Sequence, residues 1–243
     1  MNYSFLQCGE GALTVHLGDG IDPAINRRVT ALQGAIGSAG LRGITDLIPA
    51  YADLTVCYDC TVISEKALQR QLRRLLDSLP VAGQDRRRVF RLPVCYGGEY
   101  GPDLDFVCRH SGLSVQEVIA LHSAPDYLIY MLGFLPGFAY LGGLDPRLHT
   151  PRLDSPRTCI PAGSVGIGGA QTGVYPLASP GGWQLLGRTP VSVFDRQRQE
   201  PILYRAGDLV HFVPISPAEY EEIARAVAAG TYTVQVEEVS VCD

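Results

Sequence analysis

Residues 133–188 read GFLPGFAYLGGLDPRLHTPRLDSPRTCIPAGSVGIGGAQTGVYPLASPGGWQLLGR. Residues 131–190 contain 12 of the 27 glycines and 8 of the 17 prolines of the chain, but only six charged residues. A solvated linker rich in glycine and proline normally carries serine, glutamate and lysine, whereas this segment carries aromatic, aliphatic and arginine residues. We therefore expect it to form ordered loops and short strands around a functional site.

Short apolar runs separated by glycine and proline turns continue on both sides of this segment. The expected strands span residues 127–132, 163–168, 183–187, 191–194, 202–204, 208–213 and 231–239. Two capping boxes, Ser114–Glu117 and Ser216–Glu219, indicate helices among them. Many short strands with few helices are typical of a β-barrel or a β-sandwich.

The first 95 residues show a different order of elements. Apolar alternation and short apolar runs predict strands at residues 13–17, 43–49, 53–59 and 90–94. Apolar residues at helical spacing predict one helix that begins at Pro23 and another that Ser64 caps. The resulting order, β-α-β-β-α-β, is the ferredoxin-like split βαβ arrangement. We therefore predict an α+β protein, with a ferredoxin-like domain in residues 1–95 and a β-barrel domain in residues 96–243.

The charge balance argues against nucleic acid and membrane as partners. The net charge is −5, and the basic excess or stripe of a nucleic-acid-binding protein is absent. Residues 127–144 carry no charge, but Pro136 and four glycines interrupt them, and no lysine or arginine flanks them as an anchor. We expect a buried strand and turns there.

The seven cysteines indicate a reducing compartment. Their number is odd, and the first ten residues lack the cationic start and apolar run of a secretory signal. The one CxxC pair, Cys57–Cys60, has no second pair with which to hold zinc. We expect reduced cytoplasmic thiols in structural positions, and no metal site.

Residues 163–173, GSVGIGGAQTG, resemble a phosphate-binding loop but lack its defining residues. Gly168 is followed by Gly-Ala in place of Lys-Ser/Thr, and Gln171 stands where the third glycine of GxGxxG belongs. The one lysine of the chain, Lys66, lies in the other domain. This argues against a P-loop ATPase and leaves two interpretations, a cradle of backbone N–H groups for an anion or glycines used for tight barrel turns.

Four arginines lie among the apolar residues of this region: Arg147, Arg152, Arg157 and Arg188. A guanidinium binds a carboxylate or phosphate through two parallel hydrogen bonds. The alternative for each arginine is an ion pair with Asp145 or Asp154 that holds the loops together.

His122 is the one candidate for a general base, because the ordinary pKa of histidine is near neutrality. The alternative is a histidine that only caps the end of a helix. No nucleophile elbow or HExxH motif is present. The polar groups that we expect to hold an anion or a planar amide are therefore Arg152, Arg157, Ser164, Gly166, Gly168, Gly169, Gln171, Thr172, Tyr175 and Arg188.

Several segments together resemble a known bacterial family. They are GFLPGFAYLGGL, the segment from Thr150 to Pro190, and GDLVHF, with CGEGALTVHLGD, LIPAYADLTVCYD and YGGEYGPDL outside this core. The family is named for the 5-oxoprolinase B subunit, for the KipI inhibitor of a sporulation sensor kinase, and for the first subunit of allophanate hydrolase. The resemblance covers nearly the whole chain.

This resemblance implies a small α/β N-terminal domain and a cyclophilin-like β-barrel C-terminal domain. It also implies two partners, a KipA-like protein (the C component of 5-oxoprolinase) and a LamB/YcsF-like protein (its A component). Such complexes open the small molecule 5-oxo-L-proline to L-glutamate with hydrolysis of ATP, which is used with Mg²⁺, at a site that this chain shares with a partner.

Three other functions stay open at this point. A KipI-like regulator would bind the dimerisation helices of a sensor histidine kinase. A carboxyltransferase module of the urea carboxylase type needs biotin on a lysine flanked by methionines, and Met1 and Met131 are the only methionines, so we expect no biotin carrier. A prolyl isomerase rests on fold analogy alone.

Overall fold

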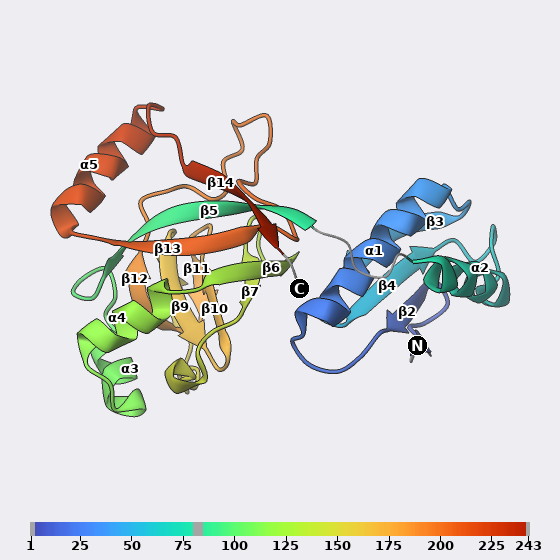
Figure 1. Cartoon of the computed structure of the whole chain (residues 1–243), viewed down its shortest axis with the longest axis horizontal. Coiled ribbons are helices and arrows are strands. Elements are labelled where there is room, and N and C mark those ends of the chain that lie inside the picture. Colours follow the sequence, from blue (N-terminus) through green and yellow to red (C-terminus); the bar gives the residue numbers. More distant parts are fainter. Residues whose placement is uncertain (1–2, 80–84, 242–243) are drawn as a thin grey trace. The chain divides into compact units, whose positions relative to one another are not determined.

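The computed structural model describes residues 3–79 and 85–241. The chain divides between residues 84 and 85 into two compact units, each with its own hydrophobic core (Figure 1).

The N-terminal unit is an antiparallel sheet with two helices on one face. Its elements are β1 (Ser4–Gln7), β2 (Ala12–His16), α1 (Pro23–Ala39), β3 (Ile44–Pro49), β4 (Asp53–Tyr58) and α2 (Glu65–Ser78). The strand order is β1-β2-β4-β3, with every neighbouring pair antiparallel. One face of the sheet packs against the inner sides of both helices to form the core of this unit.

Local sequence signals explain where the two helices begin and end. The Asp22 side chain accepts a hydrogen bond from the backbone N–H of Ala24 at 2.7 Å, ahead of Pro23 at the first position of α1. Gly40 ends α1 in the left-handed conformation, with φ of 56°. Ser64 caps α2 in the same manner as Asp22 caps α1. The predicted helices are confirmed.

The ferredoxin-like arrangement is wrong about the last strand of the N-terminal sheet. The strand predicted at residues 90–94 is part of β5 (Asp85–Tyr96), which pairs with strands of the second unit. The short edge strand β1 takes part in the N-terminal sheet instead. Alternation along a chain shows that a strand exists, but it carries no information on which sheet the strand joins. The predicted division at residues 95 and 96 therefore cuts away a strand that belongs to the barrel.

The second unit is a barrel with three helices and a short 3₁₀ turn among its described residues. Its elements are β5, α3 (Leu104–Ser111), α4 (Val115–Ser123), β6 (Asp126–Leu132), β7 (Ala139–Gly142), η1 (Pro146–Leu148), β8 (Arg157–Ile160), β9 (Ser164–Gly168), β10 (Gln171–Val174), β11 (Ser179–Gly181), β12 (Gln184–Arg188), β13 (Leu209–Ile215), α5 (Pro217–Ala228) and β14 (Gln235–Val241).

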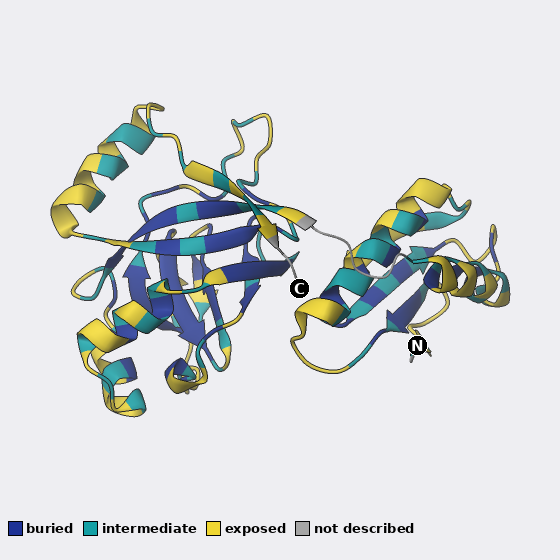
Figure 2. Cartoon of the chain, in the orientation of Figure 1, coloured by how far each residue is buried: buried dark blue, intermediate teal, exposed yellow. Residues whose placement is uncertain are grey.

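Seven strands close the barrel in the order β12-β9-β10-β7-β6-β13-β5, because β5 also pairs with β12 at its end. β14 lies outside the ring on the free edge of β5, while β8 and β11 form a small separate sheet. The barrel interior is filled by apolar residues, which side chains from α3 and α4 join. Figure 2 shows these buried residues on the barrel strands, in contrast to α5, on which no residue is buried.

The uncharged run at residues 127–144 forms most of β6, a turn and β7, as predicted. In the described part of the chain, no helix is long and apolar enough to cross a membrane. The strands predicted at 191–194 and 202–204 reduce to a single bridge between Phe194 and Ile202. The remaining predicted strands of the barrel are confirmed within a few residues at their ends.

The position of β5 predicts how fragments of the chain behave. A fragment of residues 85–243 keeps β5 and should unfold cooperatively on heating. A fragment of residues 96–243 loses the strand that pairs with β12, β13 and β14, so unpaired strand edges replace the closed ring. We expect it to give no cooperative transition in far-UV circular dichroism. Equal melting curves for the two fragments would contradict this division of the chain.

Candidate functional site

The glycines of residues 163–173 lie mostly in paired strands, not in a loop. Val165 and Ile167 of β9 belong to the barrel core. Gly166 and Gly168 alternate with them and therefore face outward, because successive side chains point to opposite faces of a strand. Across the β9–β10 pair, Gly173 lies opposite Gly166. Three glycines thus give the outside of the barrel a patch without side chains.

An indole ring occupies this patch. A Cβ atom on Gly168 would lie 2.3 Å from Nε1 of Trp183, and one on Gly173 would lie 3.3 Å from its Cζ3. Real Cβ atoms essentially never approach a heavy atom as closely as the first distance. Trp183 is the only tryptophan in the chain, and it can lie against the barrel wall only because these side chains are missing.

Trp183 is part of a small buried cluster on the outside of the barrel, separate from the barrel core. We call it the aromatic cluster; its members are Phe138, Ile160, Tyr175, Trp183 and Leu185. The rings of Phe138, Tyr175 and Trp183 meet edge to face, with centroids 5.5–6.0 Å apart, an arrangement that aromatic pairs favour. The rings hold one another in defined orientations.

Arg152 and Arg157 bring positive charge to the aromatic cluster. The Arg152 guanidinium carbon lies 6.0 Å from the centre of the Trp183 ring, at the outer limit of a cation–π contact, and the residue is exposed. Burial raises the pKa of the Tyr175 phenol, while Arg152 and Arg157 act in the opposite direction. Arg152 is therefore an exposed cation beside the buried aromatic cluster and is accessible to an anion.

Arg157 has a structural partner. Its Nη2 donates to Oδ1 of Asp103 at 2.7 Å, and its Nη1 donates to the Trp183 carbonyl at 3.3 Å. The other oxygen of Asp103 accepts from the Leu185 N–H at 2.7 Å. This ion pair ties β8 to β12 around the aromatic cluster, so Arg157 positions the site and Arg152 is left to bind an anion.

Phe134 lies at the edge of the aromatic cluster in an unusual conformation. Its φ is +63°, and no other described non-glycine residue has a positive φ. The side chain is 63% exposed and meets Phe138 edge-on at 5.5 Å. A bulky residue rarely adopts a left-handed backbone, and such strain gathers at binding sites. We include Phe134 in the candidate site.

Ser179 places a polar group beside the same cluster. It lies opposite Ile160 in the β8–β11 pair, so the two side chains share a face. Its Oγ is buried and has no hydrogen-bond partner among the described residues. Buried hydroxyls are normally satisfied, and a molecule bound beside the cluster could supply the partner.

The predicted cradle of free N–H groups is contradicted. β9 lies between β10 and β12, so its N–H groups serve the neighbouring strands. The N–H of Gly169 donates to the Thr150 carbonyl at 2.8 Å, and that of Ser164 to the Pro161 carbonyl at 3.3 Å. These groups, with Gly166 and Gly168, build the barrel and leave no cluster of donors for a phosphate.

His122 is a buried core residue and cannot act as a base on a bound substrate. Its side chain is 0% exposed, and its ring stacks on Phe212 with centroids 4.9 Å apart. The Thr172 hydroxyl donates to the Gly166 carbonyl at 3.0 Å, so it accepts from Nε2 of His122 at 2.7 Å. Nδ1 of His122 then accepts from the Tyr96 hydroxyl at 2.8 Å. Both ring nitrogens take part in a chain of hydrogen bonds, and this pattern of donors and acceptors requires a neutral imidazole.

The other predicted residues divide between the site and the rest of the barrel. Gln171 pairs with Gly168 and therefore lies on the outer patch beside Trp183. Arg188 pairs with Ser164 at the other end of β9 and donates to the Ala162 carbonyl at 3.0 Å. Arg147 forms the ion pair with Asp145 that the alternative interpretation expected, at 2.7 Å. Arg188 and Arg147 lie away from the aromatic cluster.

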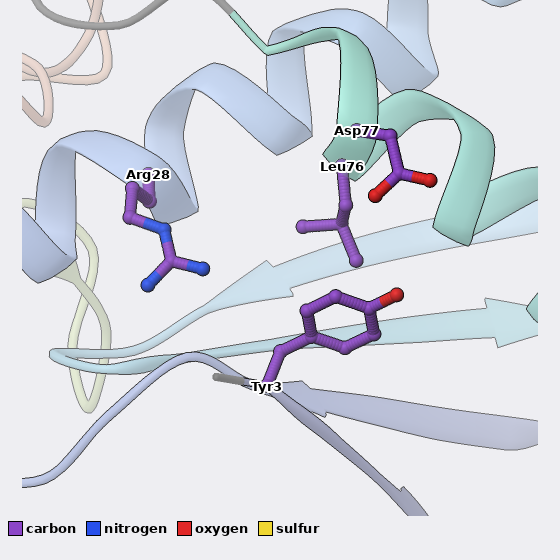
Figure 3. Close-up of a pocket in the computed structure, with 4 residues that line it drawn as sticks. All are labelled: Tyr3, Arg28, Leu76 and Asp77. Carbon is purple, nitrogen blue, oxygen red and sulfur yellow. The ribbon is translucent and has the colours of Figure 1, made fainter. Parts of the chain in front are cut away.

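A hollow lies in the N-terminal unit, which holds no residue of the aromatic cluster. It has a volume of about 160 Å³ and is lined by Tyr3, Arg28, Leu76 and Asp77. In Figure 3, Arg28 of α1 and Asp77 of α2 flank Leu76, with the Tyr3 ring facing them from the sheet side. Arg28 already donates to the Leu17 carbonyl at 3.1 Å. None of the residues predicted for the site lines this pocket.

Sequence reasoning missed Trp183, Phe134 and Asp103. The pair Gly181-Gly182 before the one tryptophan, and glycines two residues apart at 166 and 168, were the signal for an aromatic ring on a bare strand face. Asp103 gave no signal, because it lies 54 residues from the arginine that it pairs with.

The arrangement can bind but lacks the groups to move a proton. Phe134 at the edge of the aromatic cluster, Arg152 and Gln171 offer an exposed ring, a cation and an amide. Among the described residues, no three of His, Cys, Asp and Glu come together to hold a metal ion. Groups of these kinds suit a small planar molecule with a carboxylate.

Comparison with known proteins shows which family the chain is similar to. The family described as carboxyltransferase domain, subdomains C and D, matches residues 3–204. The chain is 42% identical over 230 residues to the 5-oxoprolinase B subunit of Bacillus subtilis, covering 90% of this chain and 96% of that protein. It is 45% identical over 207 residues to the 5-oxoprolinase B subunit of Escherichia coli O157:H7, covering 85% and 93%.

The chain belongs to the family of 5-oxoprolinase B subunits.

The fold recurs in a larger protein. Urea carboxylase of Kluyveromyces lactis matches with a TM-score of 0.81 over 98% of this chain and 24% of that chain, at 23% sequence identity. At this identity the likeness concerns the fold, which there forms about a quarter of a longer polypeptide. The same fold therefore occurs both in a separate polypeptide and as part of a multidomain chain.

The buried imidazole predicts how stability depends on pH. Burial lowers the pKa of His122 from 6.5 to about 3, so below pH 6.5 the unfolded chain takes up a proton that the folded chain excludes. The stability that the neutral imidazole contributes is complete above pH 6.5 and is lost as the pH falls toward 3. Between pH 7.5 and 5.0 this loss is about 2 kcal/mol of the free energy of unfolding.

Urea unfolding at the two pH values measures this loss. The loss of unfolding free energy between pH 7.5 and pH 5.0 should be about 2 kcal/mol smaller in His122→Gln than in the wild type. The matched control is His110→Gln, an exposed histidine on α3, which should keep the wild-type pH dependence. A wild-type pH dependence in His122→Gln would contradict the buried neutral imidazole.

Proposed function

We propose that this chain is the B subunit of an ATP-dependent 5-oxoprolinase complex, which opens 5-oxo-L-proline to L-glutamate. The observation that carries the proposal is the 42–47% identity to proteins named as B subunits of 5-oxoprolinase, the first of which is matched over 96% of its length. A match over almost the whole length makes a shared role the simplest account.

The aromatic cluster gives the chain a substrate-binding role in this complex. 5-Oxo-L-proline is a small lactam ring with a carboxylate. We place the carboxylate on Arg152, the ring against the exposed Phe134, and the lactam amide on Gln171. A guanidinium is the side chain best suited to a carboxylate, and an apolar wall with a few polar groups is typical of small-molecule sites.

The chemical step needs groups that we assign to the other components of the complex. A lactam is resonance-stabilised, so phosphorylation of its oxygen makes it a better electrophile, and the phosphoryl group needs positive charge around it. The strand N–H groups of β9 and the buried His122 do not fit a nucleotide site. We therefore place ATP and Mg²⁺ in the partner proteins, and leave to this chain the binding and orientation of substrate.

The partners that we propose are the KipA-like C component and the LamB/YcsF-like A component, assembled in the cytoplasm. In this proposal the outer patch around Trp183 is closed by the KipA-like component on assembly, which removes water from the bound lactam. The same family assignment leads us to regard the barrel as cyclophilin-like.

Substitution of Arg152 tests the proposed role in substrate binding. In the complex reconstituted with the KipA-like and LamB/YcsF-like components, Arg152→Ala should raise the KM for 5-oxo-L-proline about tenfold, because a charge-assisted hydrogen bond contributes about 1.5–3 kcal/mol. Its kcat should change little, since the residue binds and does not move a proton. 5-Oxoproline-dependent ATP turnover is the measurement.

Arg74→Ala, on the exposed side of α2, is the matched control and should keep wild-type kinetics. The proposed function fails if the reconstituted complex shows no turnover that depends on 5-oxo-L-proline. An unchanged KM in Arg152→Ala would remove Arg152 from the site.

A further inference from the structure

The two faces of the N-terminal sheet differ. Helices α1 and α2 cover the face that carries Leu13, Val15, Leu54 and Val56. The residues between these on the strands point to the opposite face, which no described element of the unit covers. We call this second face the open face.

The strand register defines a row across the middle of the open face. Leu6 of β1 lies beside Thr14 of β2, Thr14 beside Thr55 of β4, and Thr55 beside Ile48 of β3. The two aliphatic side chains at the ends of this row are 51% and 52% exposed. Exposed apolar residues joined in a row indicate a surface that another molecule covers.

The polar atoms in this row are already paired with one another. The hydroxyls of Thr14 and Thr55 lie 2.7 Å apart, and Sγ of Cys8 lies 3.3 Å from the Thr14 hydroxyl. The half-buried Thr55 and the exposed Leu6 and Ile48 are therefore what the row offers to a partner. Covering this surface leaves no hydroxyl without a partner, so the usual cost of burying polar groups is small.

Carboxylates surround the apolar row. Asp46 pairs across the sheet with Cys57, and Asp53 pairs with His16. The His16 ring contacts Asp53 at 2.7 Å and Asp19 at 3.5 Å. The four strands contain no lysine or arginine, whereas six of the seven cations among residues 3–79 lie on α1 and α2. The open face thus has an apolar centre and an acidic rim.

The charges and the area of the open face bear on whether a second copy of this chain or another protein covers it. A second copy of this chain would bring Asp46 and Asp53 against the same carboxylates, and like charges across an interface are unfavourable. Four strands of about five residues span roughly 300 Å², well below the ~800 Å² per partner of a stable interface. The charges therefore favour a different protein with a basic rim, and the small area means that this protein also binds the chain elsewhere.

We propose that the open face docks another protein of the 5-oxoprolinase complex through an apolar patch ringed by arginine or lysine. This proposal rests on the proposed function, because it takes the complex as given. It adds a second contact within the complex, on a unit that holds none of the residues of the candidate site.

The test measures binding of the full-length chain to the purified KipA-like and LamB/YcsF-like components by biolayer interferometry. The double variant Leu6→Arg/Ile48→Arg puts two cations in the apolar centre, and Asp46→Lys reverses one charge of the rim. Each should weaken binding to one of the two components at least tenfold, and 0.5 M salt should slow wild-type association. The control is Phe106→Arg, an exposed apolar residue of α3, which should bind as the wild type does.

The outcomes separate this proposal from the proposed function. If the wild type binds and all variants bind within twofold of it, the open face is not the docking surface and the proposed function stands. If the wild type binds neither component, both proposals fall. If the chain alone is a dimer by light scattering and the double variant is a monomer, the occupant is a second copy and our proposal is wrong.

Discussion

The organisation of the barrel unit depends on one steric constraint, the absence of side chains at Gly166, Gly168 and Gly173 on the outer face of β9 and β10. With any Cβ at Gly168, the indole of Trp183 would have to move, because the nearest ring atoms lie 2.3–2.6 Å from that position. The ring in turn orients Phe138 and Tyr175, and its carbonyl anchors Arg157. The glycine content that marks this sequence is therefore a requirement of packing, and the binding surface is its result.

The inner side of the same strands carries an independent constraint. Gly166 leaves the outer face bare, and its carbonyl accepts the Thr172 hydroxyl inside the barrel. From there a chain of hydrogen bonds runs through His122 to Tyr96 and joins β10, α4 and the end of β5. A buried polar chain with every donor and acceptor used fixes a unique arrangement of these elements. The outer side of β9 thus supports the candidate binding site, and its inner side takes part in the hydrogen bonds that hold the barrel together.

Local patterns predicted most elements of the fold, and contacts distant in sequence explain what they missed. Capping residues such as Asp22 and Ser64 act within one turn, so the helix starts could be read directly from the sequence. The sheet to which residues 90–94 belong depends on pairing with β13, more than 100 residues away. The same limit applies to the site. Arg152 and Gln171 were chosen from their residue type and stay predictions, whereas His122 was misjudged because its burial is set by β10, β13 and β5.

The bare strand face holds Trp183 and, through it, the whole aromatic cluster. The fluorescence of this single tryptophan tests that claim most directly. Gly168→Ala should move the ring from the barrel wall toward water and shift its emission to longer wavelength. Gly34→Ala, where an added Cβ meets nothing within 4 Å, should leave the spectrum unchanged. An unchanged spectrum in Gly168→Ala would contradict the claim.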